Sequence, residues 1–556
     1  MNDSLTWNKG SHFIQAGGEY RWVRSRYNIW GNARGSFVFN GAFTGTASSA
    51  YSPVADFLLG YPSSAALSSV LNGDILYKYY GGYINDDWKV TPKLTLNLGL
   101  RYEYFTAPYE RNDRNSNFLV GPNQLIYLNN NIPPSTPAGF AMKIPSGVDN
   151  RGLVKTNKNN FASRMGLAYQ LAPNTVFRAG GGVFFGDPGA AGVSSRTEYN
   201  PPFRVGYAYT SDNIHPTLTF TTGFPANAVD PTVFDPSTSA LNAWDPNSAS
   251  PVVYHWNATL EQQLGKLLVD ANYVGTKGSH LSTFYNINAP DPGGTSTAAR
   301  RPYQGFSDIT YVDSMGNSEY NALQMRVQRR YTNGISLLLS YTWSKSIDLS
   351  SGQLIGDLNF RNRNNIGWER AASSSSVPQR LVISYTYALP VGSGLHFTPT
   401  NRAVSAVVSG WQVNGITTIR NGHPFTVTTN VSSANTGQAR PNWDPSVHTP
   451  GFTPTINQWF DFAQFTPATP YNFPNEGRDV IYAPGAINFD ASLFKRVSFK
   501  KLGEAGRLEM RFERFNIFNH PQFGQPNANI SSVGAGSITF LSTSMRQLQA
   551  GLKIVF

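Results

Sequence analysis

Apolar and polar residues alternate strictly along residues 93–104, which predicts a β-strand with one apolar and one polar face. The apolar positions are Leu94, Leu96, Leu98, Leu100, Tyr102 and Tyr104. The polar positions are Lys93, Thr95, Asn97, Gly99, Arg101 and Glu103. A tilted strand crosses a bilayer in about 9 to 11 residues. This segment is therefore long enough to span a membrane, and its tyrosines stand where an interfacial aromatic belt would lie.

The same alternation recurs along the chain and continues to its last residue. Three further segments have their apolar faces at Leu323, Met325 and Val327; at Ile335, Leu337, Leu339, Tyr341 and Trp343; and at Leu508, Met510 and Phe512. The final segment places Leu548, Ala550, Leu552, Ile554 and Phe556 on one face. We predict that this ending closes an outer-membrane β-barrel and acts as its membrane-insertion signal. Taken alone, the ending also fits an ordinary edge strand.

Connections between the predicted strands alternate between short and long. Short turns with Pro, Asn or Gly are predicted at residues 90–92, 173–174, 265–266, 332–334 and 501–505. Long irregular stretches are predicted near residues 107–157, 187–250, 277–318, 348–376, 430–486 and 520–544. This asymmetry is typical of bacterial outer-membrane barrels, with the turns periplasmic and the loops outside. Residues 35–45 also read as a strand, which must belong to an outer-loop hairpin if residues 75–88 run inward.

We therefore predict an all-β chain, one transmembrane antiparallel β-barrel unit over residues 1–556 with about 15 spanning strands. The first strand is expected at residues 4–8 and the second from His12. Bacterial barrels normally have an even number of strands, so an odd number is expected upstream. If the whole barrel has about 22 strands, as plugged transporters do, roughly seven are missing. Residues 1–4 carry no export signal, so we expect the C-terminal part of a longer precursor, or a gene model starting at an internal Met.

Composition agrees with a membrane β-protein and argues against a helical enzyme. Aromatic residues make up 13% of the 556 residues and charged residues only 14%, against about 25% charged in typical soluble proteins. No apolar run of about 18 residues is present, so no transmembrane helix is expected. The net charge is +11, but the basic residues are scattered among acidic ones. We therefore expect no nucleic-acid partner.

Candidate catalytic and metal-binding motifs fail in their details. Residues 492–495 match S-x-x-K and residues 211–213 match S-D-N of penicillin-recognising enzymes, but their order is reversed and no K-T-G follows. Residues 270–275 begin like a calcium loop, but Val274 and Leu281 occupy ligand positions. The eight His residues form no HExxH pair. We expect no enzymatic activity, no catalytic or metal-binding residues, and no cofactor.

Residues 83–104, YINDDWKVTPKLTLNLGLRYEY, resemble a barrel hairpin of TonB-dependent outer-membrane receptors. Other segments resemble the Oar-like branch, which carries an N-terminal carboxypeptidase-regulatory-like domain: residues 3–10, 55–60, 273–278, 320–324 and 513–521. The resemblance covers the chain nearly end to end and implies ligand uptake across the bacterial cell outer membrane. It implies outer-membrane lipid and the barrel-assembly machinery as partners. The regulatory-like domain, TonB box and plug are missing here, so contact with the TonB complex is expected only through an absent N-terminal region.

Two functions remain open. In the first, the chain is a receptor whose outer loops bind a ligand and whose gated lumen passes it inward. Its predicted ligand-facing residues are Tyr199, Phe203, Trp459 and Phe460, although packing between loops is the more common role for such residues. In the second, the chain is a structural or adhesive barrel without active transport. The ligand is not identified, and a siderophore, cobalamin, a glycan and a peptide all remain open.

Overall fold

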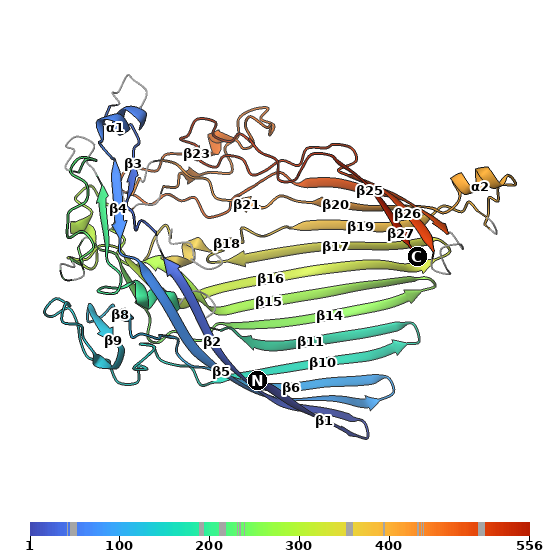
Figure 1. Cartoon of the computed structure of the whole chain (residues 1–556), viewed down its shortest axis with the longest axis horizontal. Coiled ribbons are helices and arrows are strands. Elements are labelled where there is room, and N and C mark those ends of the chain that lie inside the picture. The colour runs from blue at the N-terminus through green and yellow to red at the C-terminus, as the bar shows by residue number, and fades with distance from the viewer. Residues whose placement is uncertain are drawn as a thin grey trace.

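Strand-forming alternation along the chain produces a single large sheet (Figure 1). The computed structural model describes residues 1–556 except 30, 42, 45–52, 188–193, 211–217, 231, 233–234, 238, 352–359, 393–394, 431–432, 435, 437–438 and 499–505. Within the described residues the sheet has 18 strands, of which β7 (Tyr109–Glu110), β13 (Leu241–Trp244) and β18 (Ala371–Ala372) are short. The other fifteen are long and pair with one another antiparallel, so the predicted number of about 15 spanning strands is confirmed.

The long strands lie side by side in chain order. They are β1 (Asn2–Lys9), β2 (His12–Ile29), β5 (Leu71–Thr91), β6 (Leu94–Phe105), β10 (Asn160–Ala172), β11 (Thr175–Phe185), β14 (Val252–Leu264), β15 (Leu267–Asn286), β16 (Ile309–Thr332), β17 (Ile335–Asp348), β19 (Gln379–Ala388), β20 (Trp411–Arg420), β25 (Ala486–Ser498), β26 (Arg507–Phe515) and β27 (Gln547–Val555). Each strand therefore pairs with its nearest long neighbour in the sequence, which is the up-and-down order that a barrel wall requires.

Short turns gather at one end of the sheet, which we call the turn end. The predicted turns at residues 90–92, 173–174, 265–266 and 332–334 join consecutive strands and are confirmed. Asn333 and Gly334 adopt positive φ values of 52° and 79°, which explains the Asn-Gly pair in this turn. The predicted turn at residues 501–505 lies outside the described residues. The connection between β19 and β20 is longer and contains helix α2 (Arg402–Val408) at the turn end.

The long connections gather at the opposite end and form what we call the outer lobe: residues 31–70, 106–159, 186–251, 287–308, 349–378, 421–485 and 516–546 (Figure 1). It contains α1 (Pro53–Leu59) and the small strands β3 (Ser36–Val38), β4 (Ser64–Ser68), β8 (Ser116–Leu119), β9 (Gln124–Tyr127), β12 (Gly206–Thr210), β21 (Pro424–Phe425), β22 (Asn442–Trp443), β23 (Phe465–Thr466) and β24 (Ile481–Tyr482). The strand predicted within residues 35–45 is β3, which pairs with β4 in the outer lobe as expected.

One predicted loop boundary is wrong. Residues 277–318 were expected to be irregular, but β15 continues to Asn286 and β16 begins at Ile309. The strict alternation ends at a β-bulge after Gly278, where His280 has a positive φ of 55°. A bulge reverses the faces of the residues that follow it, so the strand continues although its sequence pattern stops.

The sheet has one apolar and one polar face, as the alternation predicts. Register places apolar positions opposite one another across neighbouring strands, as Leu98 with Met165 and Phe512 with Ala550. These side chains are exposed: 43% of Leu98, 64% of Met165 and 60% of Trp343. An exposed apolar surface that crosses a whole sheet is unfavourable in water but suits hydrocarbon. We call this surface the lipid face and the opposite surface the polar face.

Glycines on the strands provide room for aromatic rings. A Cβ atom added to Gly275 would lie 2.1 Å from the ring of Trp256 on the neighbouring strand. Gly415 stands in the same relation to Tyr385, at 2.4 Å. A Cβ atom added to Gly182 would lie 3.2 Å from the Phe184 ring. At Gly275 and Gly415 a side chain would displace the neighbouring ring, so packing favours glycine there.

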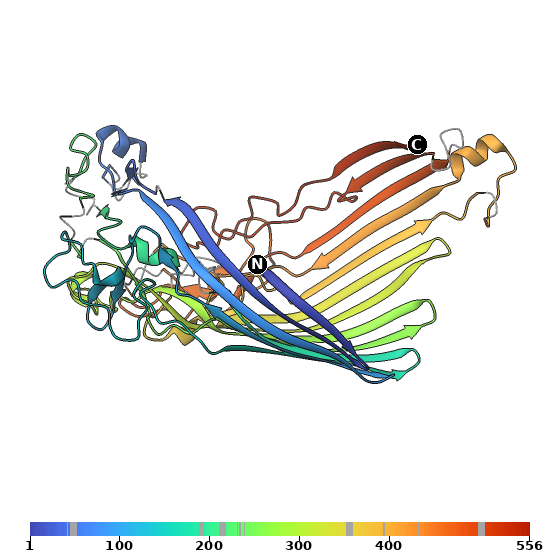
Figure 2. The same cartoon turned by 60° about the horizontal axis from the view of Figure 1, so that its bottom comes forward.

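The sheet is strongly curved but open, and β1 and β27 form its two edges (Figure 2). Among the described residues β1 pairs only with β2, and β27 only with β26. Because β1 and β27 are the first and last of fifteen antiparallel strands, they run in the same direction, toward the turn end. Direct closure would require a parallel pair. None of the helices in the described residues is long and apolar enough to cross a membrane.

Candidate functional site

An ion-paired cluster holds three strands together on the polar face. Arg101 in β6 donates from Nη2 to Oε2 of Glu19 in β2, at 2.8 Å, and from Nε to Oε1 of Glu103, at 2.9 Å. The hydroxyl of Tyr79 in β5 donates to Oε1 of Glu103 at 2.8 Å. The guanidinium also lies 5.7 Å from the centre of the Tyr83 ring. Since each charged group here has a partner, the cluster stabilises the wall and leaves no free charge for a ligand.

The outer lobe has its own hydrophobic core. The largest group of buried apolar side chains in the described residues comes from loops far apart in the sequence: Phe118, Leu125, Tyr127, Phe140, Leu241, Ala243, Tyr285, Ile287, Ile309 and Phe360. A second group contains Phe425, Val427, Phe460 and Phe465. Loops that share a core cannot move independently, because each exposes apolar area when it separates. The outer lobe is therefore a packed platform.

Buried asparagine side chains join these loops through backbone groups. Asn117 in β8 accepts a hydrogen bond from the N–H of Trp244 at 2.8 Å and donates to the carbonyl oxygens of Trp244 and Leu153 at 2.8 and 3.0 Å. Asn200 accepts from the N–H of Asn242 and donates to its carbonyl oxygen, both at 2.7 Å. Each amide thus pairs with a residue of β13 as a neighbouring strand would, and it satisfies backbone groups that burial would otherwise leave unpaired.

A buried ionic cluster connects three segments of the outer lobe. Arg361 donates from its backbone N–H to Oε1 of Glu369 at 2.7 Å and from Nη1 to the carbonyl oxygen of Glu476 at 2.8 Å. Arg440 pairs with Oε2 of Glu369 at 2.9 Å. The carboxylate of Glu476 accepts from the N–H of Val427 at 3.0 Å. All four side chains are buried, so removing Arg440 would leave the carboxylate of Glu369 buried without its ion-pair partner.

The buried Glu476 predicts that outer-lobe stability depends on pH. Burial raises the pKa of Glu476 from 4.5 to about 8. The folded state therefore binds this proton more tightly than the unfolded state. Its stabilising effect is complete below pH 4.5 and is lost as pH rises through about 8. We expect Glu476→Gln, which keeps an acceptor for Val427, to flatten this dependence by an amount on the order of a few kcal/mol at most.

Tryptophan fluorescence during thermal unfolding between pH 5 and 9 measures this effect. Burial also raises the pKa of Glu198 to about 8, so the variant should retain part of the slope. Glu319→Gln, which removes a half-exposed carboxylate, serves as the control. An unchanged pH slope in Glu476→Gln would contradict the prediction.

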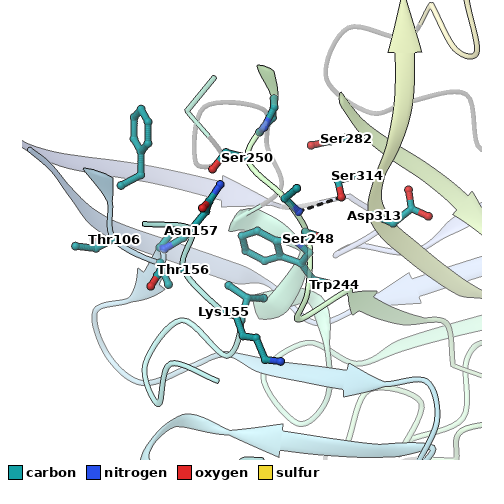
Figure 3. Close-up of a pocket in the computed structure, with 16 residues that line it drawn as sticks. Thr106, Lys155, Thr156, Asn157, Trp244, Ser248, Ser250, Ser282, Asp313 and Ser314 are labelled. Carbon is teal, nitrogen blue, oxygen red and sulfur yellow. Dashed lines mark hydrogen bonds between the residues drawn. The ribbon is translucent and has the colours of Figure 1, made fainter. Parts of the chain in front are cut away.

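A small cavity lies where the wall meets the outer lobe (Figure 3). Its lining includes Thr106, Asn157, Trp244 and Asp313, and the N–H of Ala249 donates to Oγ of Ser314 across its edge at 3.0 Å. Its volume is about 40 Å³, which is room for one or two water molecules. Organic ligands occupy pockets of about 300 to 1,000 Å³. We therefore assign this cavity to the packing between wall and lobe.

The four predicted ligand-facing residues lie in two separate parts of the outer lobe. Tyr199 has the guanidinium of Arg204 over its ring at 4.7 Å, and Phe203 packs against the core around Phe118. Phe460 is buried in the second core. Trp459 donates from Nε1 to the carbonyl oxygen of Tyr482 at 2.8 Å. These contacts pack the residues within the outer lobe, and a role in ligand recognition stays a prediction.

The predicted insertion signal lies in β27, at an edge of the sheet. Leu548, Ala550, Leu552 and Ile554 share the lipid face with Phe512 and Met510 of β26, and Phe556 follows the strand. Their apolar side chains are exposed. The strand and its faces are as predicted, and recognition by assembly machinery stays a prediction.

The apparent catalytic motif is part of the wall. Ser492 and Lys495 are three residues apart in β25, so they face opposite sides of the sheet. Nζ of Lys495 donates to the carbonyl oxygens of Ala406 and Val407 at the end of α2. Residues 211–213 lie outside the described residues. In the part of the chain that the structure describes, no three His, Asp or Glu residues are grouped as a metal site.

The chain was compared with family models, curated proteins and solved structures. The model of a family described as outer membrane beta barrel domain matches residues 1–549. Among solved structures, the outer membrane transporter YddB from Escherichia coli has 10% identity and a TM-score of 0.47, over 100% of this chain and 53% of that one. The siderophore receptor PiuA from Acinetobacter baumannii has 10% identity and a TM-score of 0.45, over 99% and 55%. The chain spans about half the length of these structures. No curated protein matches the sequence.

Proposed function

The chain belongs to the family of outer membrane β-barrel domains, and from this premise we propose that it forms most of the wall and the outer loops of a receptor for ligand uptake. Its place is the bacterial outer membrane. The outer lobe would bind a ligand from outside the cell, and the polar face would line its path inward.

The observation that carries this proposal is the combination of a packed outer lobe with a continuous polar face beneath it. An eight-stranded barrel is filled by its own side chains, whereas 16 or more strands enclose an aqueous or plugged lumen. The fifteen strands here therefore belong to a wall wide enough for passage. A barrel that served only as an anchor for an adhesive lobe would need no such width.

The finer parts of the proposal rest on the sequence. We propose that uptake is coupled to TonB, and that the protein belongs to the Oar-like branch, because residues 83–104 and the segments given above resemble those receptors. An odd number of further strands would close the wall in antiparallel fashion, since β1 and β27 run in the same direction. We propose that these strands, a plug and a regulatory-like domain complete the protein. The proposed role is binding and transport, without catalysis.

Uptake is tested by comparing cells that make the protein with cells from which its gene is deleted. We expect mass spectrometry of a complex medium to show at least one solute that only the producing cells deplete. Energy coupling predicts that a protonophore abolishes this depletion, because active transport through the outer membrane requires energy from the inner membrane.

Equal depletion by both strains across the measured solutes would reject the receptor. If the deletion strain instead lost attachment to surfaces, the structural or adhesive function would replace it. Depletion that persists with the protonophore would retain a passive channel and reject coupling to TonB.

A further inference from the structure

Two arginines face each other directly on the polar face. Arg380 in β19 and Arg420 in β20 are paired across the antiparallel ladder. The pair next to them, Leu381 and Ile419, lies on the lipid face. Successive residues of a strand alternate between faces, so both arginines project from the polar face. Directly opposed Cβ atoms in such a ladder lie about 4.5 to 5.5 Å apart.

This pair differs from several arginines of the polar face that are matched by acids. Arg326 pairs with Asp270 at 2.6 Å and Arg178 with Glu261 at 3.5 Å. In the described part of the chain, Arg380 and Arg420 form no ion pair. Nη1 of Arg420 donates only a long hydrogen bond, 3.4 Å, to the carbonyl oxygen of Asn421. Like charges directly opposite in a sheet are destabilising, so the pair costs stability unless an anion joins it.

The neighbouring groups are hydrogen-bond donors rather than acids. Thr342 in β17 is the ladder partner of Arg380 on its other side, and Thr418 precedes Arg420 on the same face. His423 follows β20, and burial together with the charge of Arg420 lowers its pKa. His423 therefore adds no negative charge beside the two arginines. Two guanidinium groups with hydroxyl groups beside them match a carboxylate or phosphate group.

The position of the pair suits a ligand on its way in. Arg380 stands near the start of β19 and Arg420 at the end of β20, where these strands meet the outer lobe (Figure 1). We propose that Arg380 and Arg420 form an anion-binding site at the mouth of the lumen, and that the transported ligand carries a carboxylate or phosphate group. This inference rests on the proposed function and names the chemical class of its ligand.

Anion titration of the protein purified from outer membranes in non-ionic detergent tests the site. The probes are inorganic phosphate and citrate at constant ionic strength, and calorimetry measures their binding. We expect saturable binding to the wild-type protein and at least tenfold weaker binding to Arg380→Gln and Arg420→Gln. Arg178→Gln removes a polar-face arginine that has an acidic partner, and it should bind both probes as the wild type does.

A second measurement separates binding from a structural role. In low salt without added anion, Arg380→Gln should raise the midpoint of thermal unfolding, because it removes the repulsion between the two guanidinium groups. Phosphate should then raise the midpoint of the wild type but not that of the Arg380→Gln/Arg420→Gln double variant. A purely structural pair would instead give a lower midpoint in Arg380→Gln at every anion concentration.

Three outcomes would overturn the inference. The first is no saturable binding of either probe, and the second is equal binding to the wild type and the double variant. In the third, neither probe changes the unfolding midpoint of the wild type, and the double variant has a lower midpoint. This result would show that the arginines hold an acidic side chain of the protein itself. Solute uptake without anion binding would remove this site and keep the receptor. Anion binding without uptake would keep this site and reject the receptor.

Discussion

Removal of residues 552–556 is expected to abolish assembly of the protein in the outer membrane. Leu552 and Ile554 pair with Met510 and Leu508, so the truncation leaves that part of β26 without a partner on the side away from β25. An unsatisfied backbone group in hydrocarbon costs several kcal/mol. The loss of several hydrogen bonds and of three apolar side chains, Leu552, Ile554 and Phe556, exceeds the stability of most domains, about 5 to 15 kcal/mol.

Membrane fractionation and the heat-dependent gel mobility of folded barrels measure this effect. The matched control is Gln549→Ala, which changes the polar face of the same strand and leaves the ladder and the last residue intact. We expect the control to assemble like the wild type. Equal membrane insertion of the truncated and complete proteins would show that the closing part of β27 is dispensable.

Leu100→Arg is expected to reduce the folded fraction strongly, whereas Asn97→Arg should have little effect. Leu100 lies on the lipid face between Ile84 and Ser163. An arginine at the bilayer midplane costs about 2 to 4 kcal/mol on that face. Asn97 lies on the polar face, where its side chain donates to Asp87 at 2.5 Å, so an arginine there meets an acid.

Leu100 has no acidic residue opposite it in the ladder, unlike its neighbour on the lipid face. Leu98 is paired with Asp86, which could neutralise an introduced arginine and hide its cost. Unfolding by denaturant in lipid vesicles gives the difference in free energy for both variants. Equal losses in Leu100→Arg and Asn97→Arg would contradict the assignment of the two faces.

The wall could be predicted from the sequence because each spanning strand has two different environments. Hydrocarbon on one side and polar surroundings on the other impose a period of two, which residues 93–104 keep without exception. Tight turns add local signals such as Asn333 and Gly334. Prediction failed where the period was interrupted, at the bulge beside His280.

The outer lobe could not be predicted because its contacts are not local. β8 and β9 are buried on both faces, so they show no alternation. The amide of Asn117 is committed to Trp244, more than a hundred residues away. Arg361 and Glu476 would be expected at the surface because they are charged residue types, yet both are buried. The directly opposed pair of Arg380 and Arg420 likewise became visible only when the register of two strands was known.

The shared core of the outer lobe has a consequence for recognition by antibodies. Phe118, Leu241 and Ile287 belong to three connections of the chain but pack in a single cluster. The surface above this cluster is therefore made of discontinuous epitopes, each held in shape by loops from elsewhere in the sequence. A synthetic peptide copied from one loop would lack that support, and immune recognition of the living cell would depend on the lobe as a whole.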